Sequence, residues 1–578
     1  MTQSINRLPL TSASAPVRTA SSGSPAAIWL VLMLALCGIY LWQVFQFTPN
    51  APRDDDLAIF VRLGTFKHWS GWASLGDLLK HHNEHRLGVM SLIAYAQYTL
   101  SGVVNFKLLA LMGNLSLLLA FAVLAWGVTD RKSEHFWPVC LLGLLVFVQW
   151  RYWQASVWPM VTISGFPAIL FAVTTMVLLA RSERWAFGLA IGSAALATLS
   201  QGNGLFIWPA GMLMLAVQQR WRAMAVWTTL TALVIPVYFI GYVAPPSHVP
   251  ISTALRNPHL LAGYFLVFLG NYPMPGFVGP WRLWLAGLLG GGLLSLSIWT
   301  ILRHGRQNPA LAGMLLFCLI SGAAAAMGRA TLGLDQALSS RYAIIPSCMW
   351  ASLLLWAGSR RWPGLSASYG VVLAVLAASW IWSYQQAAPI IEARRLEAEL
   401  GRVCDDGCVE HLIYPNLAEA FPVVHDAEKD GLFHFPRSKG CLACSVVPLV
   451  NAHVVPANAK PYHLVSAKDG WVDRVERQGA ALQIVGWARH ALAQARVLEM
   501  ALPAAPSQIK ILPVAREDVA TMLGDPRHAN SGFRLTLQFS DEVSAQAAEK
   551  KFCIASRTDS GLALLNGQPA ICDHLFLK

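Results

Sequence analysis

Carboxylates are scarce over the first two thirds of this 578-residue chain. Only nine of its 31 aspartates and glutamates precede Ile391. Charged residues make up 13% of the chain, whereas soluble domains carry about 25%. This shortage excludes an ordinary soluble domain over most of the length. It also leaves few side chains there for general acid or base chemistry.

A nucleotide-binding glycine loop and a soluble repeat are also missing. The net charge of +12 comes mostly from short basic loops between apolar runs, so it predicts no nucleic-acid partner. A basic body favours contact with anionic membrane lipid instead. The positive-inside bias predicts a cytoplasmic location for the N-terminal tail and for the loops at 181–184, 218–222, 303–306 and 360–361.

What the chain does have is long apolar runs. A membrane span needs about 20 apolar residues. Runs of about this character occur at 26–45, 108–127, 136–148, 160–179, 223–243, 283–302, 310–327, 343–356 and 369–382, and shorter ones at 87–100, 186–199, 205–217 and 260–270. The fold class predicted is a polytopic α-helical membrane protein with about 11 to 13 transmembrane helices. Gly290, Gly291 and Gly292 predict a close helix contact within one run.

After Ile390 the pattern changes to short alternating segments with glycine and proline between them. Strands are expected at 471–475, 482–487, 496–500, 509–514, 533–539 and 552–555, and a short charged helix at 392–400. We therefore expect four parts. They are a disordered cytoplasmic tail (1–25), a transmembrane domain with its first outer loop at 47–86 (26–385), a connecting region (386–461) and a β-sandwich-like domain outside the cytoplasm (462–578).

Six of the ten cysteines lie in the C-terminal part. Such a number in a loop-rich region favours disulfides and hence a periplasmic location. Natural pairs are Cys404–Cys408, Cys441–Cys444 and Cys553–Cys572, although six cysteines allow 15 connectivities. The alternative is a zinc site, because the first four cysteines have a ligand-like spacing.

Three consecutive acids, Asp54, Asp55 and Asp56, follow the first apolar run. They begin an amphipathic stretch at 57–72, so one of them is expected to cap a helix. One acid is enough for a cap, and three adjacent carboxylates repel one another. The triplet therefore favours a catalytic role in proton transfer, or a metal-binding role.

A polar cluster precedes the second span. It consists of His81, His82, Asn83, Glu84, His85 and Arg86. The cluster is suited to bind substrate, a divalent cation or a phosphate, and the alternatives are an interfacial anchor and a simple Glu84–Arg86 ion pair. If a metal binds, Asp55, Asp56 and Glu84 are the candidate ligands, and Mg²⁺ or Mn²⁺ is the candidate ion because both prefer oxygen.

A third polar segment contains Arg329, Asp335, Arg341 and Tyr342 between two strong apolar runs. It is expected on the outer side, where arginine is not favoured by the positive-inside bias. The guanidinium fork suits a phosphate, so Arg329, Arg341 and Tyr342 are candidate substrate-binding residues. The alternatives are an Arg329–Asp335 ion pair, or an Arg341 that reaches out to lipid head groups.

The order of these features resembles the GT-C superfamily of integral-membrane glycosyltransferases, which includes protein O-mannosyltransferases and aminoarabinose transferases. The likeness covers residues 26–382. It implies that a sugar passes from a polyprenyl-phosphate donor to a glycan, lipid or protein acceptor on the outer face of a membrane. It also implies that an acid of the first outer loop, here Asp54, Asp55 or Asp56, is the base or a metal ligand. Ser340, Arg341 and Tyr342 resemble late-loop motifs that contact the donor phosphate.

The function expected is therefore a glycosyltransferase of a bacterial inner membrane, with a cytoplasmic N-terminus and a periplasmic C-terminal domain. Two alternatives stay open. A flippase or transporter of a lipid-linked glycan would need inverted repeats and ionisable residues near the membrane midplane. A non-catalytic protein of envelope polysaccharide assembly would leave the acid triplet unexplained.

Overall fold

The computed structural model describes most of the chain. The described residues are 25–243, 251–272, 281–360, 365–403, 417–434, 451–454, 470–488, 497–514, 516–523, 531–558 and 561–568. The predicted cysteine pairings fall outside this set, because only Cys553 of the six C-terminal cysteines belongs to it.

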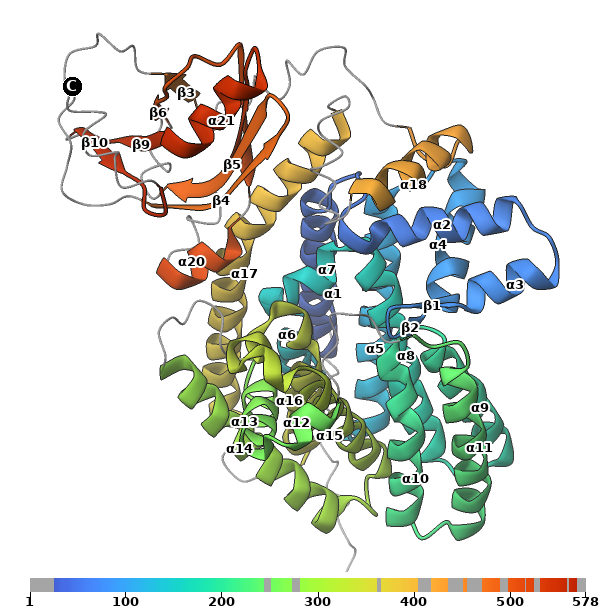
Figure 1. Cartoon of the computed structure of the whole chain (residues 1–578). Helices are drawn as coiled ribbons and strands as arrows, with labels where there is room; N and C mark the ends of the chain where they lie inside the picture. The colour runs from blue at the N-terminus through green and yellow to red at the C-terminus, as the bar shows by residue number, and fades with distance from the viewer. Residues whose placement is uncertain are drawn as a thin grey trace, which may run out of the picture.

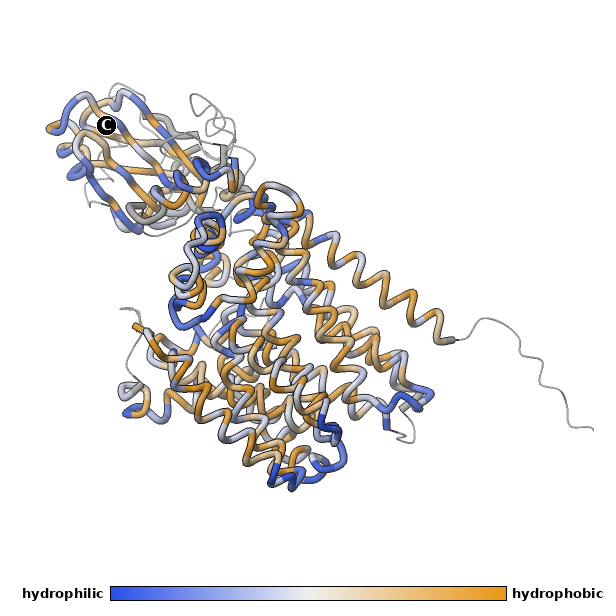
Figure 2. The backbone as a smooth tube through the Cα atoms, turned by 90° about the vertical axis from the view of Figure 1, so that its right-hand side faces the viewer, coloured by the Kyte–Doolittle hydropathy of each residue, from blue (hydrophilic) through white to orange (hydrophobic). Residues whose placement is uncertain are grey.

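The protein is a polytopic helical membrane protein. Eight helical segments of the described chain are long and apolar enough to cross a membrane. They are α1 (Pro25–Phe47), α5 (Phe106–Val128), α6 with α7 (Phe136–Phe147 and Trp153–Val157), α8 (Pro159–Leu179), α11 (Trp221–Phe239), α14 (Trp281–His304), α15 (Pro309–Arg329) and the first part of α17 (Leu365–Val403). Figure 2 shows that hydrophobic residues dominate this body, whereas hydrophilic ones gather at its ends.

The span count predicted from sequence was 11 to 13, and the difference lies in five short helices. They are α4 (Gly88–Ser101), α9 (Arg184–Thr198), α10 (Ile207–Val217), α13 (Pro258–Leu269) and α16 (Ile344–Gly358). The longest has 15 residues, which is about 22 Å at 1.5 Å per residue, and a hydrocarbon core is about 30 Å thick. These helices therefore pack in the body without meeting the length of a full span.

The basic loops meet at one end of the helical body, which we call the basic end. Arg220 Nη1 donates to the carbonyl oxygens of Leu179 at 2.6 Å and Arg181 at 2.7 Å. Asn308 Nδ2 donates to Val128 O at 2.9 Å. The sequence grouped these loops on one side, and the contacts bring them together. The compartment that this end faces stays a prediction.

The opposite end holds the acid triplet, and we call it the triplet end. Here α2 (Leu57–Lys67) and α3 (Trp72–Leu79) lie above the body, with α18 (Leu417–Lys429) beside α2 (Figure 1). The apolar side of α2 packs on α4 and on Phe433, so this side of the helix is covered by protein. The sequence predicted an amphipathic helix here but not this cover.

The C-terminal part forms two four-stranded sheets. One has the order β4–β5–β8–β7 (Gly470–Gln478, Ala481–Ala488, Gly532–Gln538, Gln508–Val514) and the other β10–β9–β6–β3 (Gly561–Leu564, Cys553–Thr558, Val497–Ala501, Asn451–Val454). Side chains alternate along β5, so that Leu482 and Ile484 face a core shared with Met500 and Ile554 of the other sheet. The six predicted strands are confirmed. β3 is an addition from the predicted connecting region, and α21 (Glu542–Lys551) covers one side.

The short charged helix expected at 392–400 is not a separate element. It is the end of α17, a continuous helix of 39 residues. Pro389 lies inside this helix without ending it. The helix therefore carries charged residues, among them Arg394, directly from the body toward the sheets (Figure 1).

The helices α13 and α14 touch at a glycine. A Cβ atom at Gly290 would lie 1.8 Å from Leu266 O, whereas one at Gly291 or Gly292 would meet nothing within 4 Å. We predict that Gly290→Ala lowers the thermal stability of the detergent-solubilised protein, because overpacking costs about 1–3 kcal/mol. Gly292→Ala is the matched control and should unfold at or above the wild-type temperature. Equal melting of the two variants would contradict this contact.

Candidate active site

The acid triplet forms a single 3₁₀ turn between α1 and α2, and its three carboxylates have different surroundings. The first, Asp54, has a φ of +49°, a left-handed conformation that is unfavourable for a residue other than glycine. Its Oδ2 accepts a hydrogen bond from Arg53 Nε at 3.1 Å. Burial raises the pKa of Asp54, and the charge of Arg53 opposes that rise. Strained backbone of this kind gathers at functional sites.

Asp56 is fully buried and holds the turn in place. Its Oδ1 accepts from the backbone N–H of Met160, at the start of α8, at 2.7 Å, and its Oδ2 accepts from the N–H of Arg53 at 3.0 Å. Burial raises the pKa of Asp56 well above its usual value, and the two N–H donors oppose that rise. Both oxygens are thus engaged by backbone. This acid anchors the turn to α8.

Asp55 is the most exposed of the three, and it faces a small hairpin. The strands β1 (His81–His82) and β2 (His85–Arg86) pair antiparallel, with Asn83 in a left-handed conformation in the two-residue turn. His82 Nε2 lies 3.7 Å from Asp55 Oδ1, and this nitrogen has no hydrogen-bond partner within the described residues. The hairpin therefore brings the polar cluster predicted from sequence to the acid triplet.

Glu84, at the tip of the hairpin, connects it to the third polar segment. Arg329 Nη2, at the end of α15, donates to Glu84 Oε1 at 2.9 Å. The guanidinium of Arg329 also lies 5.7 Å from the ring centre of Tyr342. The Arg329–Asp335 pair weighed in the sequence is absent from the described contacts, because Asp335 pairs with Arg282.

His85 is neutral at physiological pH. Burial, helped by His82 and Arg329, lowers its pKa to about 4, although Glu84 and Asp55 oppose this. The backbone N–H of Gly202 donates to His85 Nδ1 at 3.1 Å. The proton of the neutral ring is therefore on Nε2, which lies 3.8 Å from Glu84 Oε1.

Two predicted site residues are engaged elsewhere. Arg86 donates to the carbonyl oxygens of Tyr238 at 2.9 Å and Ile240 at 2.7 Å, and it also bonds Leu79 and Val237. These contacts tie the hairpin to the end of α11. His81 packs edge-on against Tyr238 and Tyr242. Both residues therefore help to hold the hairpin in place. The described contacts include no ion pair between Glu84 and Arg86, and no contact of Arg86 or His81 with Asp55.

The donors do not form a complete metal site in the described chain. No group of three histidine, cysteine or acidic side chains converges there. Of the three predicted ligands, Asp56 has both oxygens on backbone N–H groups, and Glu84 is paired with Arg329. A Mg²⁺ or Mn²⁺ site at Asp55, Asp56 and Glu84 therefore stays a prediction.

Asp55, His82, Glu84 and Arg329 form a first group of charged and polar side chains. A second group lies beside it, and of its members the sequence indicated Asp54 and Arg341 but not Glu517. Arg341 interacts electrostatically with Asp54, and its guanidinium lies 5.3 Å from the Tyr342 ring centre. Arg341 also interacts with Glu517, the first residue of α20 (Glu517–Leu523) in the C-terminal part. Tyr342 is therefore shared between Arg329 of the first group and Arg341 of the second.

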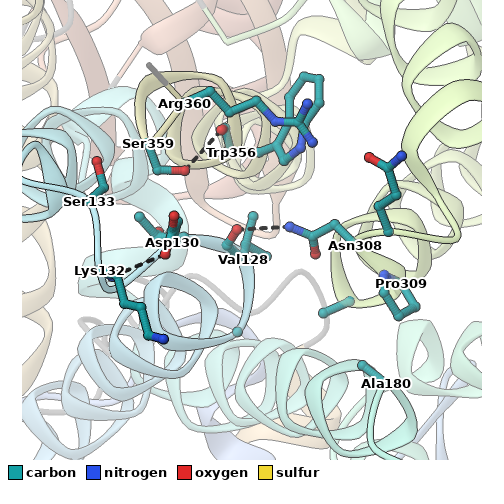
Figure 3. A pocket seen from close by; sticks show the side chains of 14 residues that line it. Val128, Asp130, Lys132, Ser133, Ala180, Asn308, Pro309, Trp356, Ser359 and Arg360 are labelled. Carbon is teal, nitrogen blue, oxygen red and sulfur yellow. Dashed lines mark hydrogen bonds between the residues drawn. The ribbon is translucent and has the colours of Figure 1, made fainter. Parts of the chain in front are cut away.

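A cavity of about 710 Å³ lies at the basic end (Figure 3). None of the predicted site residues lines it. Its polar lining groups include Lys132, Asn308 and Ser359, whose hydrogen bonds hold local loops and helix ends. We therefore assign the candidate active site to the triplet end.

Comparison with known proteins gives few matches. No protein-family model and no curated protein matches the chain. Two solved structures of ArnT from Cupriavidus metallidurans are similar to it. The form bound to undecaprenyl phosphate shares 14% identity at a TM-score of 0.38, covering 70% of this chain and 76% of that one. The apo form shares 13% at 0.40, covering 77% and 83%. Likeness at such scores carries no weight for the site, which is interpreted from its own residues.

Several candidate functional residues could not be predicted from the sequence. Arg53 precedes the triplet but carries no motif, and Arg394 sits in a run of ordinary charges. Arg151 carries no motif either, and in the structure its guanidinium donates to Asn271 and to the carbonyl oxygen of Leu338. Glu517 is one of many acids in the C-terminal part, and only the packing of α20 against the body distinguishes it.

Thermal unfolding tests whether Asp56, rather than Asp55, holds the turn in place. We predict that Asp56→Asn lowers the stability of the solubilised protein by about 1–3 kcal/mol, because at least one buried N–H loses its acceptor. Asp55→Asn should unfold like the wild type, because Asp55 is partly exposed. Thermal unfolding of both variants in one detergent checks this. A stable Asp56→Asn protein would contradict the anchoring role.

Proposed function

We propose that the protein is a membrane glycosyltransferase that uses a polyprenyl-phosphate-linked sugar. The observation that carries the proposal is the convergence of acids and arginines from distant segments at one end of an apolar helical body. Asp55, Glu84 and Arg329 belong to one connected group, although Glu84 and Arg329 are 245 positions apart. Such a group is costly to maintain beside a membrane unless it serves a function.

Asp55 is the proposed base. Transfer to an acceptor hydroxyl requires that its proton be taken as the oxygen attacks the anomeric carbon of the sugar. Asp56 is engaged by backbone, and Asp54 is paired with Arg53. Asp55 is the carboxylate with the fewest described partners, and His82 Nε2 lies 3.7 Å from its Oδ1. One base is sufficient if the reaction inverts the anomeric centre.

The arginines are the proposed phosphate contacts. As the new glycosidic bond forms, the bond from the anomeric carbon to the phosphate oxygen breaks. The electron pair leaves with the polyprenyl phosphate, whose charge increases. Arg341 is suited to stabilise that charge, since its Nε is buried without a hydrogen-bond partner in the described structure. Arg329 is partly neutralised by Glu84 and adds a weaker field.

The remaining parts of the proposal follow the sequence. The acceptor is an envelope glycan, lipid or protein, and the triplet end faces the periplasm of a bacterial inner membrane. The C-terminal sheets lie at this same end and are suited to cover the site (Figure 1). A flippase is less favoured, because the charged contacts described above lie at helix ends and in loops rather than near midspan.

The proposed base is tested by sugar transfer in proteoliposomes supplied with polyprenyl-phosphate-linked sugars. We predict that Asp55→Asn reduces the transfer rate by about 10²- to 10⁴-fold, which is the usual contribution of a general base. Donor binding should change little, because the described ion pair of Asp55 is with His82 and not with an arginine.

The control for this test is Asp77→Asn. Asp77 is an exposed acid of α3 in the same predicted outer loop, and its electrostatic partner is Arg62 rather than a residue of the triplet or the hairpin. This variant should transfer sugar at the wild-type rate. Full activity of Asp55→Asn at matched protein levels would refute the assignment of the base.

A further inference from the structure

Glu517, in the C-terminal part, contacts the charged residues of the triplet end. Its Oε2 accepts from Arg394 Nη2, on α17, at 3.1 Å and from Gln154 Nε2, on α7, at 3.3 Å. The carboxylate also interacts electrostatically with Arg53, Arg151 and Arg341. An acid of the C-terminal part thus interacts with arginines of the helical body and of α17.

The arginines outnumber the acids in this group. Arg53, Arg151, Arg341 and Arg394 carry four positive charges, and the acids that interact with them are Asp54, Asp56 and Glu517. Asp54 and Asp56 both interact with Arg53, whereas Arg151 and Arg394 interact with Glu517. The neighbouring Asp518 and Asp335 are each paired with another arginine. The group therefore has an excess of positive charge.

Two arginine N–H donors without acceptors also favour an anion-binding site. The Nε atoms of Arg341 and Arg394 are buried and have no hydrogen-bond partner within the described residues. A buried donor without an acceptor is unfavourable by about 1–3 kcal/mol, so such groups call for an explanation. An anion with more acceptor oxygens than one carboxylate would supply the missing partners, and a phosphate group has this property.

Glu517 is a weakly held occupant. Burial raises its pKa to about 7, in spite of the arginines around it. Its charged form is therefore less stable here than in water. The side chain is 28% exposed, so a path to solvent exists.

We propose that Arg53, Arg151, Arg341 and Arg394 form a binding site for a phosphate group, and that Glu517 occupies this site until the phosphate displaces it. The site is adjacent to the candidate base, because Arg53 and Arg341 both interact with Asp54. Displacement would release Glu517, at the start of α20, from Arg394 and Gln154. The inference rests on the proposed function only for the identity of the lipid that carries the phosphate.

The test is equilibrium binding of radiolabelled polyprenyl monophosphate to the full-length protein in phosphatidylcholine nanodiscs. We expect Glu517→Gln to bind about tenfold more tightly, the low end of what a hydrogen bond to a charged group contributes. Two controls remove a charge elsewhere. Asp518→Asn changes the next residue of α20, and Glu542→Gln changes the exposed first residue of α21. Both should bind within about twofold of the wild type, because Asp518 pairs with Arg516 and Glu542 is exposed, so that neither pairs with the four arginines of the proposed site.

A second measurement needs no variant. Saturating polyprenyl monophosphate should increase the hydrogen exchange of α20 amides in the wild type, because Glu517 leaves its partners. Competition with phosphatidylglycerol and with inorganic phosphate identifies the source. Competition by polyprenyl monophosphate alone assigns the donor lipid, whereas equal competition by phosphatidylglycerol assigns a phospholipid head group.

The contrary results are equally clear. Unchanged or weaker binding by Glu517→Gln, or unchanged exchange of α20 at saturation, would overturn the displacement. Because these readouts measure binding, they hold whether or not sugar is transferred. Loss of transfer in Asp55→Asn together with normal binding by Glu517→Gln would leave the proposed function standing and remove only this site.

Discussion

The ion pair between Glu84 and Arg329 is the contact on which the triplet end depends. It joins the hairpin before α4 to the end of α15, across 245 positions of sequence, with 2.9 Å between nitrogen and oxygen. The hairpin in turn brings His82 to Asp55, and Arg329 brings Tyr342 and its neighbour Arg341. Charges beside an apolar body are tolerated when they are paired. The ion pair therefore fixes how the acid triplet, the hairpin and the segment from Arg329 to Tyr342 lie relative to one another, although they are far apart in the sequence.

The fold follows from the sequence to a large extent, because its signals are strong and local. Apolar runs near 20 residues became the long helices, and the alternating segments after Ile390 became strands. The differences have physical causes. The runs that form α4, α9, α10, α13 and α16 are shorter than a full span, and helix length, rather than hydropathy, separates them from the eight long segments. The segment at 392–400 is continuous with α17, since no residue between them ends the helix.

The site was less predictable, because its geometry depends on contacts between distant segments. Sequence located the acid triplet, the polar cluster and the late arginines, and the structure brings members of all three together. The sequence did not distinguish Asp56, whose two oxygens accept hydrogen bonds from backbone N–H groups, from Asp55, which is partly exposed. Nor did it reveal that Arg86 supports α11, or that an acid of the C-terminal part meets the arginines. Identical residue types acquire different roles through burial and partners alone.

The central claim is that phosphate-bearing lipid binds at the triplet end. Photo-crosslinking of a polyprenyl monophosphate with a diazirine near the phosphate, followed by peptide mapping of the wild-type protein in nanodiscs, tests it most directly. We predict labelled peptides that contain Asp54–Asp56 and Arg329–Tyr342. Labelling confined to the cavity at the basic end, around Lys132 and Arg360, would contradict the account.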